Sequence, residues 1–435
     1  MSYLNKQIET MPREELKKLQ SERLVAQVKK VYENVECFRN RMDELGLKPS
    51  DIKGVEDLHK LPFSYKQDLR DYYPYGLFAE PLENIVRVHA SSGTTGKRIV
   101  VGYTKEDLDM WAECVARMLT AVGVDKNDIF QVSFGYGFFT GGFGLHAGAE
   151  KIGALVVPIS SGNTALQIQT LIDFKVTAFC CTPSYAMYLA EEVERLGVKD
   201  QLSLKVGIFG AEPWSESMRN EIEQKLGIKA YDIYGLSEIL GPGVSCECEY
   251  QCGMHVWEDN FIVEIIDPDT GEVLPEGSTG ELVFTTISKQ GFPIIRYRTR
   301  DICSLEYAPC KCGRTHVRMN KPSGRSDDML IIRGVNVFPS QIEEVLLSIS
   351  NECITPNYLI RVGRVNNADT FDLDVEMSEH IFNDDIKSIS KIEKEITDKL
   401  RSMLGLGVKV HLVNPKTIAR SEGKAKRVID TRKIM

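Results

Sequence analysis

Short runs of β-branched residues alternate with stretches of helical periodicity between about residues 85 and 290, and this alternation constrains the possible folds most strongly. The expected strands are "DIFQVSF", "ALVVPI", "VTAFCC", "KVGIFG" and "KAYDIY", and helical stretches such as "AMYLAEEVERLG" and "SESMRNEIEQKLG" lie between them. Strands that alternate with helices form a parallel sheet covered by those helices, so the predicted fold class is α/β. Ligands of such sheets bind in loops beyond the carboxyl ends of the strands.

The pattern differs on either side of this region. Residues 12 to about 45 have apolar residues at helical spacing, and "FIVEIIDPDTGEVLPEGSTGELVFTTI" indicates antiparallel strands joined by a PDTG turn. Near Gly324 a smaller α+β unit begins, with strands "DTFDLDVEM" and "GVKVHLV" and a helix whose apolar face carries Ile386, Ile389, Ile392, Ile396 and Leu400. A chain of 435 residues exceeds one ordinary domain, and we expect two, at 1–323 and 324–435.

Acidic residues outnumber basic ones by 62 to 53, and the net charge of −9 argues against nucleic-acid or anionic-membrane partners, which need clustered positive charge. The first twenty residues lack the apolar segment of a signal peptide, and no run approaches the ~18 apolar residues of a membrane helix. We therefore expect a cytoplasmic protein. Because that compartment is reducing, its 11 cysteines are expected to serve packing or metal binding rather than disulfides.

The loop SSGTTGK at 91–97 follows "NIVRVHA", which has the alternation of a strand. Glycines, hydroxyls and one lysine can converge on a phosphate without steric cost. The spacing of a P-loop NTPase fails, because Ser91 stands where the first glycine belongs and Arg98 follows the lysine. A plain hairpin turn is the other interpretation, although the hydroxyls before Gly-Lys exceed what a turn needs. SSGTTGK, GAEPW and YGLSE are all expected in loops beyond strand ends.

Five motifs in a fixed order resemble the adenylate-forming superfamily of acyl-CoA synthetases: SSGTTGK, YGLSE at 234–238, RYRTRD at 296–301, GRSDDMLIIRGVNVFPSQIE at 324–343 and EGK at 422–424. The segment "LPFSYKQDLRDYYPYGLFA" at 61–79 resembles the phenylacetate-CoA ligase branch in particular. The resemblance covers nearly the whole chain. It implies a large N-terminal AMP-binding domain, with helix-covered, mostly parallel sheets and a small β subdomain, and a small mobile α+β C-terminal domain.

The resemblance also implies a nucleotide site. Tyr234, followed by Gly235, would stack on adenine, Ser237 would face the α-phosphate, and Glu238 would hold Mg²⁺. The remaining nucleotide-binding residues that it implies are Ser91, Ser92, Gly93, Thr94, Thr95, Gly96 and Lys97 around the β- and γ-phosphates, Asp232 at the adenine amino group, Gly210, Ala211, Glu212 and Pro213 beside the adenine, Asp301 at the ribose hydroxyls, and Arg325.

The implied reaction has two halves. A carboxylate attacks the α-phosphate of ATP to give an acyl-adenylate and pyrophosphate, and the thiol of coenzyme A then displaces AMP. Relatives rotate the small domain between the halves. Asp327 matches the family hinge residue, and Lys424 matches the lysine that bridges the substrate carboxylate and the α-phosphate. Gly334 matches a glycine that leaves room for pantetheine.

The segment "SFGYGFFTGGFGLHAGAEKIG" mixes aromatic residues with glycines at 135, 137, 141, 142, 144 and 148. A dinucleotide fingerprint fails because Thr140 stands where the third glycine belongs, and so many glycines would weaken a core element. Aromatic walls with glycine clearance suit a flat aromatic acid. The expected wall residues are Tyr136, Phe138, Phe139 and Phe143, and the resemblance gives Tyr136 first. Phenylacetate, substituted arylacetates and benzoate-like acids all remain open.

Two short clusters, "CECEYQCGMH" and "CKCGRTH", resemble the halves of a structural Zn²⁺ site with four N or S ligands. Reduced buried thiols, as expected for Cys180 and Cys181, are the alternative. Spacing alone favours Cys252 with His255, a C-x-x-H pair. Relatives with the C-x-C-G-R knuckle imply four ligands that do not include Cys252. Cys246, Cys252 and His316 remain possible alternative ligands. The predicted ligands are Cys248, His255, Cys310 and Cys312.

Taken singly, Tyr234 could be core filler, Glu238 a solvated charge, Asp301 a turn residue and Lys424 part of a solvated tail. The ordered motifs together favour the functional interpretation, with Glu212 evenly balanced. We expect a homodimeric ligase that uses ATP, Mg²⁺ and coenzyme A with a small aromatic carboxylic acid, without nucleic-acid or membrane partners. There are two alternatives. One is an adenylating enzyme for another aromatic acid or another acceptor, and the other is a non-catalytic nucleotide-binding module.

Overall fold

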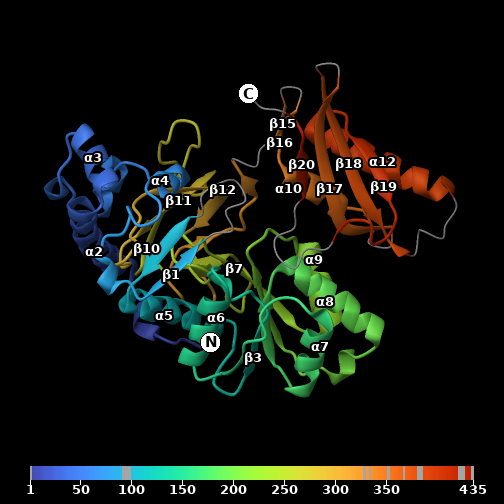
Figure 1. The fold of residues 1–435 in the computed structure, drawn as a ribbon, viewed down its shortest axis with the longest axis horizontal. Coiled ribbons are helices and arrows are strands. Elements are labelled where there is room, and N and C mark those ends of the chain that lie inside the picture. The colour runs from blue at the N-terminus through green and yellow to red at the C-terminus, as the bar shows by residue number, and fades with distance from the viewer. Residues whose placement is uncertain are drawn as a thin grey trace.

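The computed structural model describes residues 2–90, 99–326, 330–332, 335–349, 353–365, 368–379, 386–419 and 427–432. The predicted phosphate loop at 91–97, together with Asp327, Gly334 and Lys424, lies outside the described residues. Figure 1 shows a large N-terminal part, coloured blue to yellow, and a smaller orange and red part beside it. The predicted α/β class with a small C-terminal unit is confirmed.

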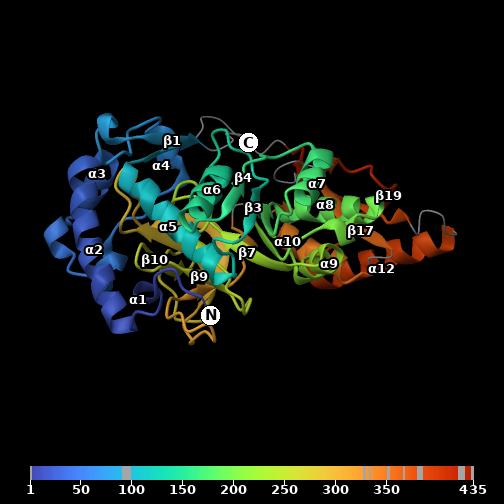
Figure 2. The same ribbon diagram turned by 90° about the horizontal axis from the view of Figure 1, so that it is seen from below.

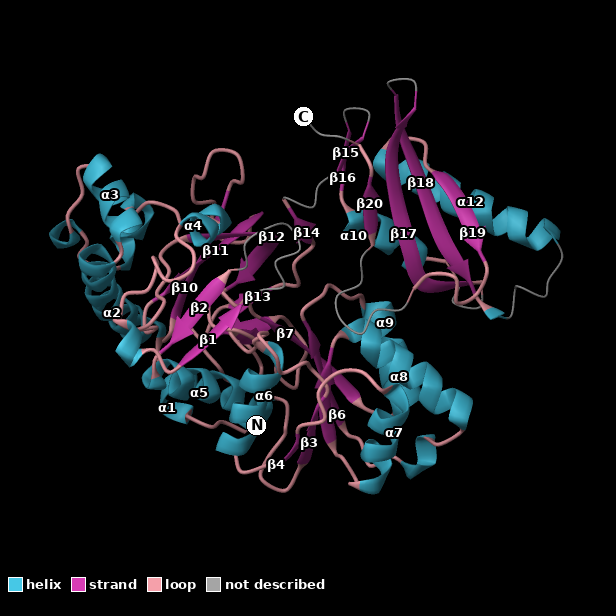
Figure 3. Cartoon of the chain, in the orientation of Figure 1, coloured by secondary structure: helices cyan, strands magenta, loops and turns pink. Residues whose placement is uncertain are grey.

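All five expected parallel strands form, and they are neighbours in the order β4, β3, β5, β6, β7. Their bounds are Ile129–Val132 for β3, Leu155–Val157 for β4, Ala178–Cys181 for β5, Val206–Gly210 for β6 and Lys229–Tyr234 for β7. Helices α7 (Thr164–Asp173), α8 (Pro183–Leu196) and α9 (Glu216–Leu226) lie together on one side of these strands in Figure 3. The β-branched runs predict this half of the sheet correctly.

The same sheet continues through antiparallel pairs. These strands are β8 (Ser245–Cys246), β9 (Met254–Val256), β13 (Arg318–Met319), β12 (Tyr297–Glu306), β11 (Thr279–Thr286) and β10 (Phe261–Ile266), and β14 (Gly324–Arg325) also pairs with β12. The expected hairpin is the β10–β11 pair. The antiparallel half therefore extends the parallel sheet, and β14 attaches the segment around residue 324 to it.

Strands β1 (Arg87–Ala90) and β2 (Val100–Tyr103) form a separate antiparallel pair. The expectation that SSGTTGK follows a strand of the parallel sheet is therefore wrong. The reason is the connection length, because a short loop can reverse the chain between antiparallel strands, whereas parallel neighbours need a crossover of a dozen or more residues.

The remaining elements of the N-terminal part are mostly helical. They are α1 (Lys6–Glu9), α2 (Arg13–Asn34), α3 (Glu36–Glu44), α4 (Lys66–Asp71), α5 (Lys105–Ala121), α6 (Gly141–Lys151) and the 3₁₀ turns η1 (Pro49–Asp51), η2 (Val55–Lys60), η3 (Leu82–Asn84) and η4 (Lys199–Gln201). The helical stretch expected over 12–45 breaks at Val35, whose backbone is extended. None of the helices within the described ranges combines the length and apolar character that a membrane crossing requires.

The C-terminal unit has a core of its own, in which Ile360, Leu373, Ile396 and Leu400 are fully buried. Its sheet has the order β19-β18-β17-β20. The elements are β15 (Leu330–Ile332), β16 (Val335–Val337), α10 (Pro339–Leu347), β17 (Ile354–Val365), β18 (Ala368–Met377), α12 (Ile386–Leu404), β19 (Lys409–Val413) and β20 (Val428–Asp430). The expected strands and helix of this unit are confirmed, whereas the domain division at Gly324 stays a prediction.

Helices α5 and α6 lie side by side in Figure 2, and two glycines of α6 bring them close. A Cβ atom on Gly144 would overlap the Trp111 indole, and one on Gly148 would overlap the Val115 side chain. Both partners are fully buried. The clearance that these two glycines provide therefore serves helix packing, and not an aromatic ligand as the sequence suggested.

We expect Gly148→Ala to lower the free energy of unfolding by about 1–3 kcal/mol, because Val115 is β-branched and cannot rotate away from the added methyl group. The intrinsic gain of roughly 1 kcal/mol for alanine in a helix is too small to offset this overlap. Gly137→Ala is the matched control, since none of the described atoms lies within 4 Å of the position that its added methyl group would take. Thermal or urea unfolding measures both, and an unchanged Gly148→Ala protein would contradict the packing argument.

Candidate active site

Strands β6 and β7 are parallel neighbours, so their carboxyl ends bring two predicted loops together. Gly210 ends β6 and begins GAEPW, and Tyr234 ends β7 and begins YGLSE. A Cβ atom on Gly210 would overlap the backbone carbonyl of Ile233, and one on Gly235 would overlap that of Gly241. Glycine is therefore required at both positions by the close approach of the backbone, whatever ligand binds there.

Tyr234, Asp301 and Arg325 form one connected group from three strands. The Tyr234 hydroxyl donates a hydrogen bond to Asp301 Oδ2 (2.6 Å), and Arg325 Nη1 donates to Asp301 Oδ1 (2.9 Å). The Tyr234 ring stacks on Phe284 with 6.0 Å between centroids and 16° between planes. Three predicted nucleotide-binding residues thus meet in space, and one face of the tyrosine ring is already covered.

Ser237 and Glu238 connect the YGLSE loop to two other elements. The Ser237 hydroxyl lies 3.1 Å from that of Thr140, at the start of α6. Glu238 is buried, and its Oε1 accepts a hydrogen bond from the Tyr297 hydroxyl (3.2 Å). The loop predicted to face the phosphates therefore touches the segment that carries the predicted acid pocket, between Phe139 and Phe143.

Two of the four predicted pocket residues pack together. The Tyr136 and Phe143 rings meet edge to face at 5.2 Å, and the Tyr136 hydroxyl lies 3.1 Å from His146 Nδ1. Phe138 and Phe139 are 57% and 51% exposed. The structure therefore gathers Tyr136 and Phe143 into a ring cluster, whereas Phe138 and Phe139 lie at the surface.

Glu212, the acidic residue of the GAEPW loop, has a structural role at the start of α8. Glu212 Oε1 accepts a hydrogen bond from the backbone N–H of Ser184 (2.7 Å), in the first turn of α8, where backbone donors lack helical partners. Ala211 precedes it in the left-handed region, with φ of 73°. Both nucleotide roles stay predictions. Asp232, in the carboxyl-terminal half of β7, is buried, and this burial raises its pKa to about 7.

Sequence analysis missed two buried polar residues near these loops. Lys289 is fully buried, and its Nζ lies 4.7 Å from the Tyr103 ring centroid and 5.0 Å from that of Phe292. Burial lowers its pKa to about 8, opposed by the charges of Asp107 and Glu238. His89 lies in β1, 5.4 Å from the Phe143 ring. No motif spacing identifies either residue, because their positions depend on tertiary packing.

The four predicted zinc ligands lie together and are all buried, with their ligand atoms within 4.8 Å of one another. Cys312 Sγ is 3.3 Å from His255 Nε2, and Cys248 Sγ is 3.7 Å from Cys310 Sγ. His255 Nδ1 lies 3.3 Å from the His316 carbonyl, a contact that orients the other ring nitrogen toward the thiols. Three sulfurs and one imidazole suit a closed tetrahedral zinc site, so the donor set fits the metal.

The three alternative ligands lie differently. Cys246 belongs to the main core, and the His316 ring nitrogens face the Glu258 N–H and the Ile8 carbonyl. Cys252 is exposed, with its Sγ 3.5 Å from Cys310 Sγ. Of the alternatives, Cys252 alone adjoins the group of four within the described part of the chain.

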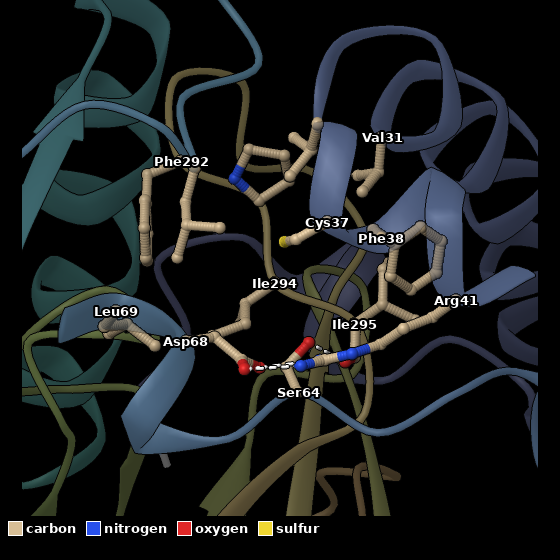
Figure 4. A pocket seen from close by; sticks show the side chains of 13 residues that line it. Val31, Cys37, Phe38, Arg41, Ser64, Asp68, Leu69, Phe292, Ile294 and Ile295 are labelled. Carbon is tan, nitrogen blue, oxygen red and sulfur yellow. Dashed lines mark hydrogen bonds and ion pairs between the residues drawn. The ribbon is translucent and has the colours of Figure 1, made fainter. Parts of the chain in front are cut away.

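A small cavity of about 20 Å³ lies elsewhere, between α2, α3, α4 and residues 292–295. Figure 4 shows the ion pair between Arg41 and Asp68 at its edge and the Cys37 thiol beside it. The volume suits roughly one water molecule. None of the predicted site residues lines it, so this cavity carries no functional argument.

The end of parallel strand β7 brings a tyrosine beside a carboxylate and an arginine from two antiparallel strands, and this position is typical of α/β proteins that bind a ligand beyond their strand ends. Comparison with protein families gives the particular family. The chain matches the model described as AMP-binding enzyme over residues 19–288, and that described as AMP-binding enzyme C-terminal domain over residues 334–432. The chain therefore belongs to the AMP-binding enzyme family.

Relatives with established names match nearly the full length. The chain is 50% identical to the phenylacetate-coenzyme A ligase of Thermus thermophilus over 442 residues, which covers 98% of this chain and 99% of that protein. It is 48% identical to the phenylacetate-coenzyme A ligase of Escherichia coli over 431 residues, with 98% of each chain covered. The predicted resemblance to this branch is confirmed.

Two solved structures of 2-hydroxyisobutyryl-CoA ligase also match. In the postadenylation state with 2-HIB-AMP, that enzyme superposes with a TM-score of 0.91 at 31% identity, covering 99% of this chain and 92% of its own. In the thioesterification state with 2-HIB-AMP and CoA, the TM-score is 0.72 at 31% identity, covering 99% and 93%. The described arrangement of the two parts is thus closer to the postadenylation state.

Proposed function

We propose that this chain is an ATP-dependent ligase that converts phenylacetate and coenzyme A into phenylacetyl-CoA, AMP and pyrophosphate. The observation that carries the proposal is the meeting of YGLSE, Asp301 and Arg325 at one sheet edge, in a chain 50% identical over 98% of its length to a phenylacetate-coenzyme A ligase. A carboxylate is a poor acyl donor, and the adenylate intermediate supplies the leaving group that thiol attack requires.

The connected group on β7, β12 and β14 suits the nucleoside. The face of the Tyr234 ring opposite Phe284 would stack on adenine. Each carboxylate oxygen of Asp301 accepts a hydrogen bond within this group, and a carboxylate offers about four lone-pair positions, so ribose hydroxyls could donate to it as well. Arg325 pairs directly with this carboxylate and balances its charge.

The charged end of the nucleotide would meet the YGLSE loop. Ser237 would face the α-phosphate, and Glu238 would hold Mg²⁺, whose charge eases attack on phosphorus. The contact between Ser237 and Thr140 supports this assignment, because it brings the phosphate side of the site beside the aromatic segment that carries Tyr136 and Phe143. The carboxylate of a bound arylacetate could then approach phosphorus directly.

Pyrophosphate release from ATP and Mg²⁺, measured across phenylacetate, hydroxyphenylacetate, indoleacetate and benzoate, with and without coenzyme A, tests the proposal. We expect acid-dependent pyrophosphate release with phenylacetate as the best substrate, and AMP release that depends on coenzyme A. Release of ADP and phosphate would exclude adenylation. Nucleotide binding without any turnover would favour a non-catalytic module instead.

We expect Lys424→Ala to reduce adenylation by about two to three orders of magnitude, because an ammonium would no longer neutralise the approach of carboxylate to phosphate. Conversion of supplied phenylacetyl-adenylate and coenzyme A to thioester should be largely retained, since the second half-reaction would use another orientation of the C-terminal unit. The two half-reactions are assayed separately on one purified variant. Lys426→Ala is the matched control, and equal loss of both half-reactions in Lys424→Ala would refute the two-orientation mechanism.

We expect Tyr136→Ala to raise the KM for phenylacetate far more than the KM for ATP, because of the two substrates its ring would contact the acid and not ATP. Tyr136→Phe keeps the ring and removes the hydroxyl that lies beside His146, so its KM for phenylacetate should stay close to that of the wild type. Steady-state kinetics with each substrate varied in turn measures both. A Tyr136→Ala variant with equal changes in the two KM values would remove Tyr136 from the pocket.

We also propose that Cys248, His255, Cys310 and Cys312 bind a structural zinc ion. Elemental analysis of protein purified without added metal should find about one zinc per chain, matching a single closed four-ligand site. Cys310→Ser should lose the zinc and unfold at a lower temperature. Its kcat should change little, because the cluster contacts none of the predicted reacting groups within the described residues. Cys252→Ser is the matched control and should retain the metal. A zinc-free protein of full stability would leave these thiols as core residues.

A further inference from the structure

Four charged residues from four segments surround the predicted adenine edge. They are Asp232 on β7, Glu247 just after β8, Arg219 on α9, and Lys321, between β13 and β14. Asp232 is only 6% exposed, and it lies in the carboxyl-terminal half of the strand that leads into YGLSE. Sequence analysis identifies Asp232 but not Lys321, which there is a single basic residue in a loop.

Arg219 forms a bidentate ion pair with Glu247. Its Nη1 donates to Glu247 Oε2 (2.7 Å), and its Nη2 donates to Glu247 Oε1 (2.8 Å). The same Nη1 also donates to the Ala230 carbonyl. The backbone N–H of Asp232 donates to Glu247 Oε2 (2.8 Å), so the two acidic residues are close neighbours. This guanidinium therefore neutralises Glu247 first.

The Asp232 carboxylate has a different cation. Lys321 Nζ lies 3.8 Å from Asp232 Oδ2, a distance that provides attraction without a direct hydrogen bond. The indole N–H of Trp214, which has no hydrogen-bond partner of good geometry among the described residues, lies near enough to favour the ionised carboxylate as well. The Lys321 ammonium and the Trp214 indole N–H thus both favour the ionised form of the buried Asp232 carboxylate.

Lys321 itself is held in place by two contacts. Its Nζ pairs with Glu216 at 2.7 Å and lies 4.6 Å from the centroid of the Trp214 ring, in the GAEPW loop. Glu216 is largely exposed, with 68% of its side-chain surface accessible, whereas Lys321 is 28% exposed. The ammonium is therefore anchored between the exposed Glu216 and the buried Asp232.

The balance of charge at Asp232 depends on this lysine. Burial raises the pKa of Asp232 to about 7, and the nearby charge of Glu247 also acts to raise it. Lys321 is the largest opposing influence, followed by Trp214 and Arg219. Without Lys321 the pKa would rise, and the carboxyl group would be mostly protonated at neutral pH.

We propose that Lys321, whose ammonium lies 3.8 Å from Asp232, is a positioning residue that favours the carboxylate form of Asp232 as the acceptor for the adenine amino group, and thereby makes the site selective for ATP over GTP. The inference rests on the proposed function. An ionised carboxylate only accepts hydrogen bonds, so it favours the amino group of adenine and repels the carbonyl oxygen that guanine carries at that position. A protonated carboxyl group can donate to that carbonyl, and the discrimination is then lost.

The test compares Lys321→Met, Lys321→Arg and Glu216→Gln by pyrophosphate release with ATP and with GTP between pH 6 and 9. We expect Lys321→Met to raise the KM for ATP roughly tenfold with kcat little changed, and to narrow the ATP-to-GTP preference by a similar factor, as expected for loss of a charge-assisted hydrogen bond. Lys321→Arg should restore both values. Glu216→Gln removes the contact that anchors Lys321 on its exposed side but leaves the ammonium, so it should shift both values in the same direction as Lys321→Met and by a smaller factor.

The pH profile separates charge from structure. In the wild type, the KM for ATP should rise as the pH falls through about 7, because Asp232 becomes protonated there. In Lys321→Met this rise should begin at higher pH. An unshifted profile, equal effects of Lys321→Met and Glu216→Gln, or unchanged nucleotide preference would overturn the proposal.

A binding measurement keeps this inference distinct from the function itself. Calorimetric titration with ATP and with GTP, in the absence of acid and coenzyme A, requires no turnover. Selective ATP binding that weakens in Lys321→Met would support the role of Lys321 even if phenylacetate were not the substrate. An active ligase whose ATP affinity is unchanged by Lys321→Met would leave the proposed function intact and refute the positioning role.

Discussion

The carboxylate of Asp301 is the interaction on which the described site depends, because it joins three strands that otherwise belong to different halves of the sheet. It accepts hydrogen bonds from Tyr234 on β7 and from Arg325 on β14, while Asp301 itself lies on β12. A buried carboxylate needs such partners to stay ionised. The end of the parallel half, the antiparallel half and the segment that leads to the C-terminal unit therefore meet at one side chain, in addition to their backbone pairing.

Much of this arrangement could be predicted from the sequence, for identifiable reasons. The strands β3 to β7 are short β-branched runs bounded by helices, so local pattern and tertiary environment agree. The order of motifs identifies YGLSE and Asp301, and Cys and His spacing combined with a resemblance identifies the four clustered Cys and His residues. The contacts of Asp301 with Tyr234 and Arg325 could not be predicted. They join three strands that are far apart in sequence, and only the tertiary fold brings these strands together.

The sequence-based predictions that the structure corrects are those in which a local pattern has more than one physical explanation. Glycines at 144 and 148 suit either a flat ligand or two close helices, and only the position of α5 distinguishes the two. The alternation in "NIVRVHA" fits any strand, and the short connection to β2 decides the antiparallel pairing. Lys289 and Lys321 belong to no motif, because their surroundings are formed by residues far away in sequence.

The position of β14 constrains how the C-terminal unit can move. Arg325 is paired with β12 through the backbone and with Asp301 through its side chain, so its contacts belong to the N-terminal part. The separate C-terminal core already includes Ile332. Any rotation that preserves both sets of contacts must therefore take place between Arg325 and Ile332, a stretch that contains Asp327. Such a pivot would leave Tyr234, Asp301 and Arg325 in contact throughout, so the residues proposed to hold the nucleotide need not change while the C-terminal unit presents a different surface to the site.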